Sequence, residues 1–178
     1  MKTSVYIGTS LDGFIAREDG DIEWLVKYQN KEVGDSYVAF IKRIDAIVIG
    51  RGTYEKVLTF PSWPYDRKVF ILSNTIKQLP EKLKGKATVL SMQPKELLDH
   101  LSKEGFSNLY IDGGKVIQGF LKADCIDELI ITRVPELIGS GIPLFGGLEN
   151  DLAFKHIKTE TYSNDLVKSY YERDRVKR

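Results

Sequence analysis

The sequence predicts an α/β fold, with a mostly parallel central sheet and an antiparallel C-terminal hairpin. Strand-like and helix-like segments alternate along most of the chain, whereas two strand-like segments follow one another at its end. Residues 45–50 (DAIVIG) are apolar almost throughout, as is typical of a strand buried on both faces of a parallel sheet. Residues 153–162 and 166–173 alternate apolar and polar side chains around the turn Ser163-Asn164-Asp165, which predicts the hairpin.

Before residue 45 the pattern predicts one strand, a long loop and one helix. Residues 3–8 are rich in β-branched and aromatic side chains and form the expected first strand. The loop that follows contains Asp-Gly pairs at 12–13 and 19–20, a dipeptide that favours turns. The helix is expected over residues 31–44, because apolar side chains recur there on one face: Val33, Tyr37, Phe40, Ile41 and Ile44.

After residue 50 the alternation continues. A short helix is expected to begin at residue 51, with Thr53 as its N-cap. The other expected helices cover residues 94–104 and the segment from Gly113-Gly114 to about residue 122. The other expected strands cover residues 68–73, 87–91, 108–112 and 127–134.

Length and composition narrow the class of protein. A chain of 178 residues suits one domain covering residues 1–178. The net charge of +1 gives no support for nucleic-acid or anionic-membrane binding. The single cysteine, Cys125, excludes an internal disulfide framework and a multi-cysteine zinc site, and no metal is expected. No apolar run approaches the roughly 20 residues that span a bilayer, and no signal-peptide pattern is present, so the expected location is the cytoplasm.

Two strand–glycine–helix junctions are the most informative local feature. They are AIVIG-RGTYE at 46–55 and LYID-GG-KVIQGFL at 109–121. A helix start presents unpaired N–H groups and a partial positive charge, and glycine lets a phosphate approach the backbone. For either junction alone, a tight turn is the favoured interpretation. Two junctions on neighbouring strands, each with a cation beside its glycine (Arg51 and Lys115), favour nucleotide binding.

These segments occur in the order of a known family. The chain resembles the dihydrofolate reductase-like superfamily, and more closely the branch named after the C-terminal reductase domain of bacterial riboflavin biosynthesis. The segment DELIITRVPELIGSGIPLF at 127–145 is the most specific match, because it aligns a strand, a proline and the GSGIPLF loop in one block. The other matching segments are SLDGFIA (10–16), IVIGRGTYE (47–55), VFILSN (69–74) and LYIDGGKVIQGFL (109–121).

The resemblance implies a three-layer dihydrofolate reductase-like fold and a reductase that uses NADPH. The cofactor pyrophosphate would lie between the two helix starts, with Arg51 near the adenosine 2′-phosphate, which favours NADPH over NADH. Ile15 and Ala16 would lie close to the nicotinamide, and Ser73 and Asn74 would line the adenosine side. The other cofactor-binding residues that the resemblance implies are Gly50, Gly52, Thr53, Gly113, Gly114, Lys115, Val116 and Ile117.

Candidates for the chemistry itself are fewer. The superfamily often has a carboxylate on its first long helix that orients the substrate, which makes Asp35 the candidate catalytic and substrate-binding residue. Alternatively, Asp35 only complements the positive N-terminus of its helix. Trp24 and Ile111 are further candidates for substrate binding, although a core position is the favoured interpretation of Trp24.

Two residues depart from the dihydrofolate reductase pattern. Asp112 stands where those enzymes have an additional glycine, and Ile117 stands where they often have an aromatic residue. The expected function is therefore reduction of a C=N or C=O in a small pyrimidine- or pteridine-type substrate, similar to that of 5-amino-6-(5-phosphoribosylamino)uracil reductase of riboflavin biosynthesis. A dihydrofolate reductase and a non-catalytic nucleotide-binding module are the alternatives. The resemblance also implies a homodimer.

Overall fold

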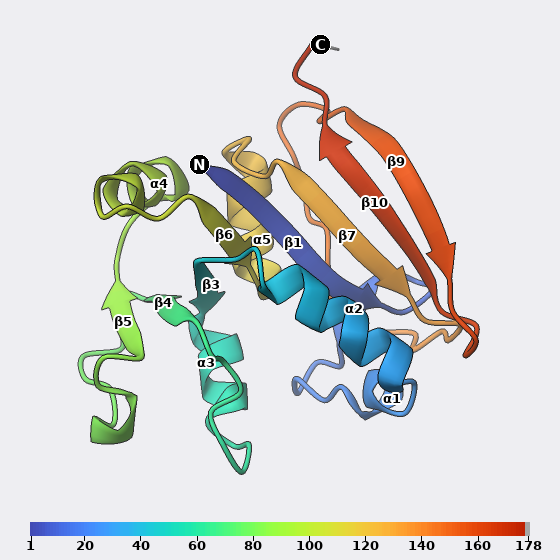
Figure 1. The fold of residues 1–178 in the computed structure, drawn as a ribbon, viewed down its shortest axis with the longest axis horizontal. Helices are drawn as coiled ribbons and strands as arrows, with labels where there is room; N and C mark the ends of the chain where they lie inside the picture. The colour runs from blue at the N-terminus through green and yellow to red at the C-terminus, as the bar shows by residue number, and fades with distance from the viewer. Residues whose placement is uncertain (177–178) are drawn as a thin grey trace.

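The computed structural model describes residues 1–176 and contains one eight-stranded sheet and one two-stranded sheet. The large sheet has the order β5-β4-β3-β6-β1-β7-β10-β9 (Figure 1). Its strands are β1 (Lys2–Thr9), β3 (Ala46–Gly50), β4 (Lys68–Leu72), β5 (Ala87–Leu90), β6 (Asn108–Ile111), β7 (Glu128–Arg133), β9 (Phe154–Thr161) and β10 (Val167–Arg173). The small sheet pairs β2 (Phe14–Ala16) with β8 (Ile142–Pro143).

The pairing confirms the predicted fold class. The strands from β5 to β7 in the sheet order pair in parallel with one another, and β10 is antiparallel to both β7 and β9. β3 is buried at four of its five positions, as its apolar sequence predicts. Residues 177 and 178, at the end of the predicted single domain, lie outside the described part, and the single-domain assignment stays a prediction.

Helices cover both faces of the sheet, which makes the three layers. They are α1 (Glu23–Val26), α2 (Lys31–Ile41), α3 (Arg51–Val57), α4 (Pro94–Lys103) and α5 (Gly114–Lys122), with a 3₁₀ turn, η1 (Glu81–Leu83). One core cluster packs α4 and α5 against the sheet through Leu97, Leu101, Ile117 and Phe120. The cluster on the opposite face includes Phe40 of α2 and Tyr54 of α3. In Figure 1, α2 crosses in front of the sheet and α5 lies behind it.

The structure differs from the sequence-based elements in several places, including the unexpected β8 and η1. The segment expected to be one loop contains β2 and α1, and β2 is held by pairing with β8, far along the chain. The long helix ends at Ile41 rather than at residue 44. Thr53 does not cap α3, because the helix begins at Arg51 with Gly50 as its N-cap.

A buried lysine ties the C-terminal hairpin to the rest of the fold. Lys168 of β10 is fully buried. Its Nζ donates to the hydroxyl oxygen of Tyr6 on β1 at 2.6 Å and to Oγ of Ser36 on α2. The ammonium also lies 4.6 Å from the Tyr6 ring centroid. Burial lowers the pKa of Lys168 to about 8, because the charged form loses hydration.

The pKa of Lys168 predicts a pH dependence of stability. Its folded value of about 8 lies below the ordinary 10.5. Between these values the unfolded chain binds more protons than the folded chain, so the free energy of unfolding rises with pH. We expect this group to contribute about 3 kcal/mol to that rise. Urea unfolding between about pH 7.5 and pH 10.5 measures it.

Two substitutions isolate the contribution. Lys168→Met removes the ammonium and should lose most of the rise relative to the unmodified protein. Lys155→Met, at an exposed position of β9, should keep the rise. Equal slopes for the unmodified protein and Lys168→Met would contradict the assignment.

Candidate active site

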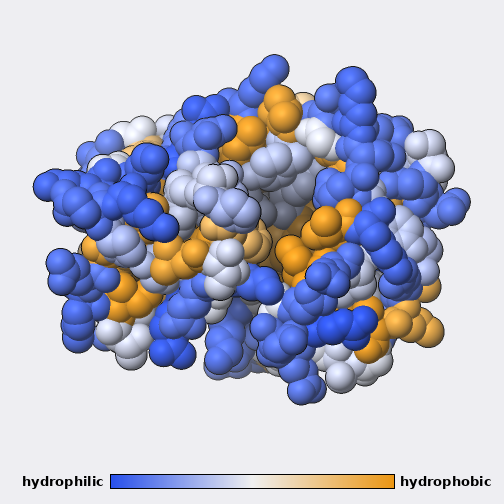
Figure 2. Space-filling view, turned by 90° about the horizontal axis from the view of Figure 1, so that it is seen from below, coloured by the Kyte–Doolittle hydropathy of each residue, from blue (hydrophilic) through white to orange (hydrophobic). Residues whose placement is uncertain are grey.

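The structure brings the two predicted glycine junctions side by side. β3 and β6 are parallel neighbours, with Ala46 opposite Leu109 and Val48 opposite Ile111. α3 begins directly after β3, and two residues, Asp112 and Gly113, separate the end of β6 from the start of α5. Figure 2 views the molecule from below Figure 1, where β1 and β7 end, and shows a hollow near the middle of this face with hydrophobic residues beside it. This edge of a parallel sheet is where ligands usually bind.

Glycine is required at both helix starts because they touch each other. A Cβ on Gly113 would lie 2.4 Å from Thr53 Oγ1, and a Cβ on Gly50 would lie 2.9 Å from Val116 Cγ2. Gly113 also has a φ of +91°, which other residues rarely adopt. Thr53 therefore packs against the second junction instead of capping its own helix. Any side chain at position 113 would push the two helix starts apart.

The first loop and the GSGIPLF loop close over the second junction. A Cβ on Gly114 would lie 3.2 Å from Ile15 Cδ1 and 3.0 Å from Ile142 Cγ2, so β2 and β8 both pack on the start of α5. Asp12 holds the two loops together, because its Oδ2 accepts from the Gly139 N–H at 2.8 Å. The predicted nicotinamide-side residues, Ile15 and Ala16, thus belong to β2, the strand that packs on the start of α5.

A polar pocket of about 410 Å³ lies at the ends of β4 and β5. Ser73 and Asn74, the predicted adenosine-side residues, line it together with Ser91, Gln93 and Glu96. Ser73 Oγ accepts from the Thr75 and Ile76 N–H groups, and Ser91 Oγ donates to Asn74 Oδ1. The two hydroxyl-bearing loops are therefore linked across the floor of this pocket.

The two cations of the junctions are solvent-accessible. The Arg51 side chain is 57% exposed, with its Nε 3.7 Å from Glu55 Oε1, and Lys115 is exposed at the first turn of α5. Ion pairs of this kind at a surface contribute little free energy. Both side chains are therefore available to an anionic ligand at the junctions.

A carboxyl group among phenols lies at the end of β6, and sequence reasoning did not identify it as a site. Asp112 directly precedes Gly113 and is half-buried, and its Oδ1 accepts from the Gly113 N–H at 2.8 Å. The hydroxyls of Tyr110 and Tyr65 affect the pKa of the same carboxyl group, and the Tyr110 hydroxyl donates to the Tyr6 carbonyl oxygen at 2.9 Å. Tyr37 of α2 interacts with the charge of Asp112 as well. One carboxyl group and three phenols thus gather beside the second junction.

Burial dominates the protonation of this cluster. It raises the pKa of Asp112 to about 6, although the Gly113 N–H and the tyrosine hydroxyls oppose the shift. Burial, followed by the charge of Asp112, raises the pKa of Tyr65 and Tyr110, and that of Tyr37 to about 12. The phenols therefore stay neutral hydrogen-bond donors at neutral pH. The Asp112 carboxyl group can gain and lose a proton close to physiological pH.

Asp35 lies on another side of α2. Its side chain is 65% exposed, and its Oδ2 accepts from Lys31 Nζ at 2.5 Å. Residues two apart on a helix project about 200° apart, so Asp35 and Tyr37 face opposite ways. Asp35 is the fifth residue of α2, and the acidic residue of the first turn is Glu32. The assignment of Asp35 to catalysis or substrate binding stays a prediction.

The other predicted substrate-binding residues are in the core. Trp24 is 4% exposed and packs against Val134 and Leu166, as the core interpretation expects. Ile111 is fully buried between the layers, as is Ile117 of the second junction. Their contact with a substrate or cofactor stays a prediction. Among residues 1–176, no group of three or more His, Cys, Asp or Glu side chains could hold a metal ion.

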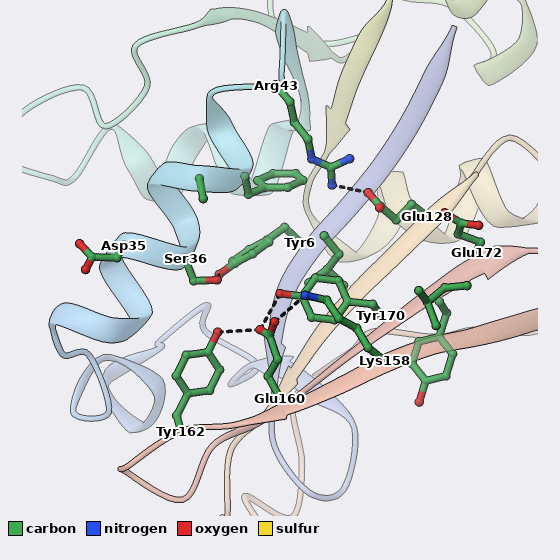
Figure 3. Close-up of a pocket in the computed structure, with 15 residues that line it drawn as sticks. Tyr6, Asp35, Ser36, Arg43, Glu128, Lys158, Glu160, Tyr162, Tyr170 and Glu172 are labelled. Carbon is green, nitrogen blue, oxygen red and sulfur yellow. Dashed lines mark hydrogen bonds and ion pairs between the residues drawn. The ribbon is translucent and has the colours of Figure 1, made fainter.

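A second cavity, of about 650 Å³, lies between α2 and the hairpin (Figure 3). Tyr162, Tyr170 and Lys158 all direct their polar groups to the Glu160 carboxylate, and Arg43 pairs with Glu128 at the other end. Asp35 lies on its rim. Because both of its cations already pair within the cavity, Arg43 with Glu128 and Lys158 with Glu160, we rank it below the edge with the two junctions as a candidate for catalysis.

Sequence comparison identifies relatives. The RibD C-terminal domain family model matches residues 63–168. The uncharacterized protein YwjB of Bacillus subtilis (strain 168) is 37% identical over 174 residues, which are 95% of this chain and 97% of that protein. No helix in the described part of the chain is long and apolar enough to cross a membrane.

Solved structures agree with the sequence relatives. A Shewanella sp. PV-4 protein, named provisionally as a riboflavin biosynthesis protein, has a TM-score of 0.93 and 44% identity, with 98% of this chain and 100% of that chain covered. The diaminohydroxyphosphoribosylaminopyrimidine deaminase/5-amino-6-(5-phosphoribosylamino)uracil reductase of Thermotoga maritima has a TM-score of 0.77 and 18% identity, over 97% of this chain and 56% of that chain.

Dihydrofolate reductase from Enterococcus faecalis, complexed with NADP(H), shares the fold. Its TM-score is 0.69 at 16% identity, with 97% of this chain and 96% of that chain covered. The predicted dihydrofolate reductase-like fold is thereby confirmed. The family match over residues 63–168 and the relative that is 37% identical confirm the predicted branch. The chain belongs to the RibD C-terminal domain family.

Proposed function

We propose that this chain is an NADPH-dependent reductase that transfers a hydride to a C=N or C=O carbon of a small pyrimidine- or pteridine-type substrate. One observation carries the proposal. Two touching glycine-marked helix starts lie next to a carboxyl group, Asp112, whose pKa burial raises to about 6. Membership in a family of reductase domains supports an oxidoreductase.

The helix starts fit the pyrophosphate of a dinucleotide. Gly50 and Gly113 leave space that a Cβ would fill, and backbone N–H groups at such positions bind phosphate. Residues 50–53 would hold the pyrophosphate from one side and residues 113–117 from the other. Ser73 and Asn74 would hold the adenosine half, and Arg51 would hold the 2′-phosphate. The bound nicotinamide would supply the hydride.

The remaining chemistry falls to side chains of this chain. Reduction of a C=N or C=O needs a proton at the nitrogen or oxygen as the hydride reaches the carbon. Oδ1 of Asp112 is engaged by the Gly113 N–H, so the other carboxyl oxygen would carry that proton. The Tyr65 hydroxyl would orient the carboxyl group, and Ile15, which packs against Gly114, would exclude water from the site.

The substrate class follows from the relatives. The Thermotoga maritima enzyme of the same fold is named for reduction of 5-amino-6-(5-phosphoribosylamino)uracil, a pyrimidine. We propose a substrate of that type, with dihydrofolate as the main competitor because the fold is shared with dihydrofolate reductase. The homodimer and the cytoplasmic location inferred from the sequence stay predictions.

Substitution of Arg51 tests the cofactor. Arg51→Ala should weaken NADPH binding about ten- to a hundredfold, because a charge-assisted hydrogen bond contributes roughly 1.5–3 kcal/mol. NADH binding should barely change, since NADH lacks the 2′-phosphate. Calorimetric titration measures both dissociation constants. Lys115→Ala is the control, because a cation at the other junction should affect both cofactors alike. Equal weakening of NADPH and NADH by Arg51→Ala would show that the 2′-phosphate lies elsewhere.

Substitution of Asp112 tests the proton donor. Asp112→Asn should lower kcat about a hundred- to ten-thousandfold while leaving NADPH affinity unchanged. The donor must be protonated, so kcat/KM of the unmodified enzyme should fall as the pH rises through about 6. The residual activity of Asp112→Asn should lack this fall. Rates of NADPH oxidation with a panel of pyrimidines, pteridines and dihydrofolate measure this.

Asp66→Asn, at an exposed position close to the phenols, is the control for Asp112→Asn and should keep the pH profile.

Three outcomes would count against parts of the proposal. An unchanged profile in Asp112→Asn would remove Asp112 from the proton step. Fast, saturable turnover of dihydrofolate would make that the substrate. NADPH binding without turnover of any panel member would favour a non-catalytic nucleotide-binding module.

A further inference from the structure

The lining of the adenosine-side pocket, the polar pocket at the ends of β4 and β5, contains one carboxylate. Glu96 is the one ionisable side chain among the described residues that line the pocket, and it lies in the first turn of α4. The other polar groups of the lining are the neutral side chains of Ser73, Asn74, Ser91 and Gln93. The lining itself therefore offers hydrogen-bond donors and acceptors together with one negative charge.

Arg51, the cation proposed to bind the 2′-phosphate, follows β3, on the other side of the pocket from α4. Gly50 is paired with Leu72 in the sheet, so Arg51 and Ser73, the next residues, leave the sheet edge side by side. Leu72 is in turn paired with Leu90, and the Ser73 N–H donates to the Leu90 carbonyl at 3.0 Å. Glu96 thus lines the pocket on its α4 side, and Arg51, outside the lining, follows the strand next to the pocket on its β3 side.

Glu96 is held in place by the backbone. The Gln93 N–H donates to Glu96 Oε2 at 3.4 Å, which positions the carboxylate at the helix start. Oε1 has no hydrogen-bond partner within residues 1–176. A carboxylate with a free oxygen accepts hydrogen bonds from ribose hydroxyls and repels a phosphate.

We propose that Glu96 is a specificity-determining residue of the adenosine pocket, where it binds the free 2′-hydroxyl of NADH and opposes the 2′-phosphate of NADPH. Arg51 and Glu96 then act in opposite directions on the same ribose position. An acidic residue reads the 2′-hydroxyl and an arginine accommodates the 2′-phosphate in dinucleotide sites generally. Here both are present, so the chain binds both cofactors with a smaller preference for NADPH than Arg51 alone would produce. The inference rests on the proposed function, because it places the adenosine half of the dinucleotide in this pocket.

The test is a pair of calorimetric titrations, with NADPH and with NADH, on three proteins. They are the unmodified chain, Glu96→Gln and Asp99→Asn. Gln keeps the shape of Glu96 and can still accept from the Gln93 N–H. Asp99→Asn makes the same charge change on the same helix, at an exposed position outside the pocket lining. Thermal unfolding of each protein checks that it is folded.

We expect Glu96→Gln to bind NADPH about three- to tenfold more tightly, because a repulsive charge is gone. It should bind NADH about three- to tenfold more weakly, because a neutral acceptor replaces a charged one. Asp99→Asn should leave the ratio of the two dissociation constants unchanged. These titrations need no substrate and no turnover.

The outcomes separate this inference from the proposed function. If the unmodified chain binds neither cofactor, the proposed cofactor is wrong and the role of Glu96 is wrong with it. If both cofactors bind and Glu96→Gln leaves their ratio unchanged, only the role of Glu96 is overturned. If Asp99→Asn shifts the ratio as much as Glu96→Gln does, the effect comes from the general charge of α4, and the specific role of Glu96 is overturned as well.

Discussion

The contact between the starts of α3 and α5 is the constraint on which the candidate site depends. Gly113 meets Thr53, and Gly50 meets Val116, at distances that leave no room for a side chain. This contact is possible because β3 and β6 are parallel neighbours that end at the same edge of the sheet. It sets the position of Asp112, which joins β6 to Gly113, and that of Ile15, which rests against Gly114.

The sequence predicted what short-range patterns determine. The continuous apolar run of β3, the alternation in the hairpin and the glycines after β3 and β6 each carry a local signal, and the structure has these elements nearly as expected. It could not predict β2, because three residues hold a strand only through distant pairing with β8. Thr53 was misassigned as a cap because a threonine near a helix start has that ordinary role, whereas here it faces a second helix.

The cluster of phenols around Asp112 could not be predicted from the sequence, for a different reason. Its phenols come from α2, from the loop before β4 and from β6, and no spacing along the chain relates Tyr37, Tyr65 and Tyr110. Asp112 itself had a signal, because it replaces a glycine of the dihydrofolate reductase pattern beside the second junction. Asp35 is the opposite case, because it had a signal in the sequence and its role stays a prediction. On α2, Tyr37 interacts with the charge of Asp112, whereas the exposed Asp35 side chain pairs with Lys31 of the same helix.

The place of β1 in the sheet has a consequence for how the chain folds. β1 is synthesised before the other described strands, yet its two neighbours are β6 and β7, and the Thr3 N–H bonds to Asp127, 124 residues away. Contacts of such long sequence separation slow folding, because the loop must close before the contacts form. During synthesis the N-terminal strand therefore stays unpaired until more than half of the chain has emerged. β1 can pair on both of its edges only after β6 and β7 have been synthesised.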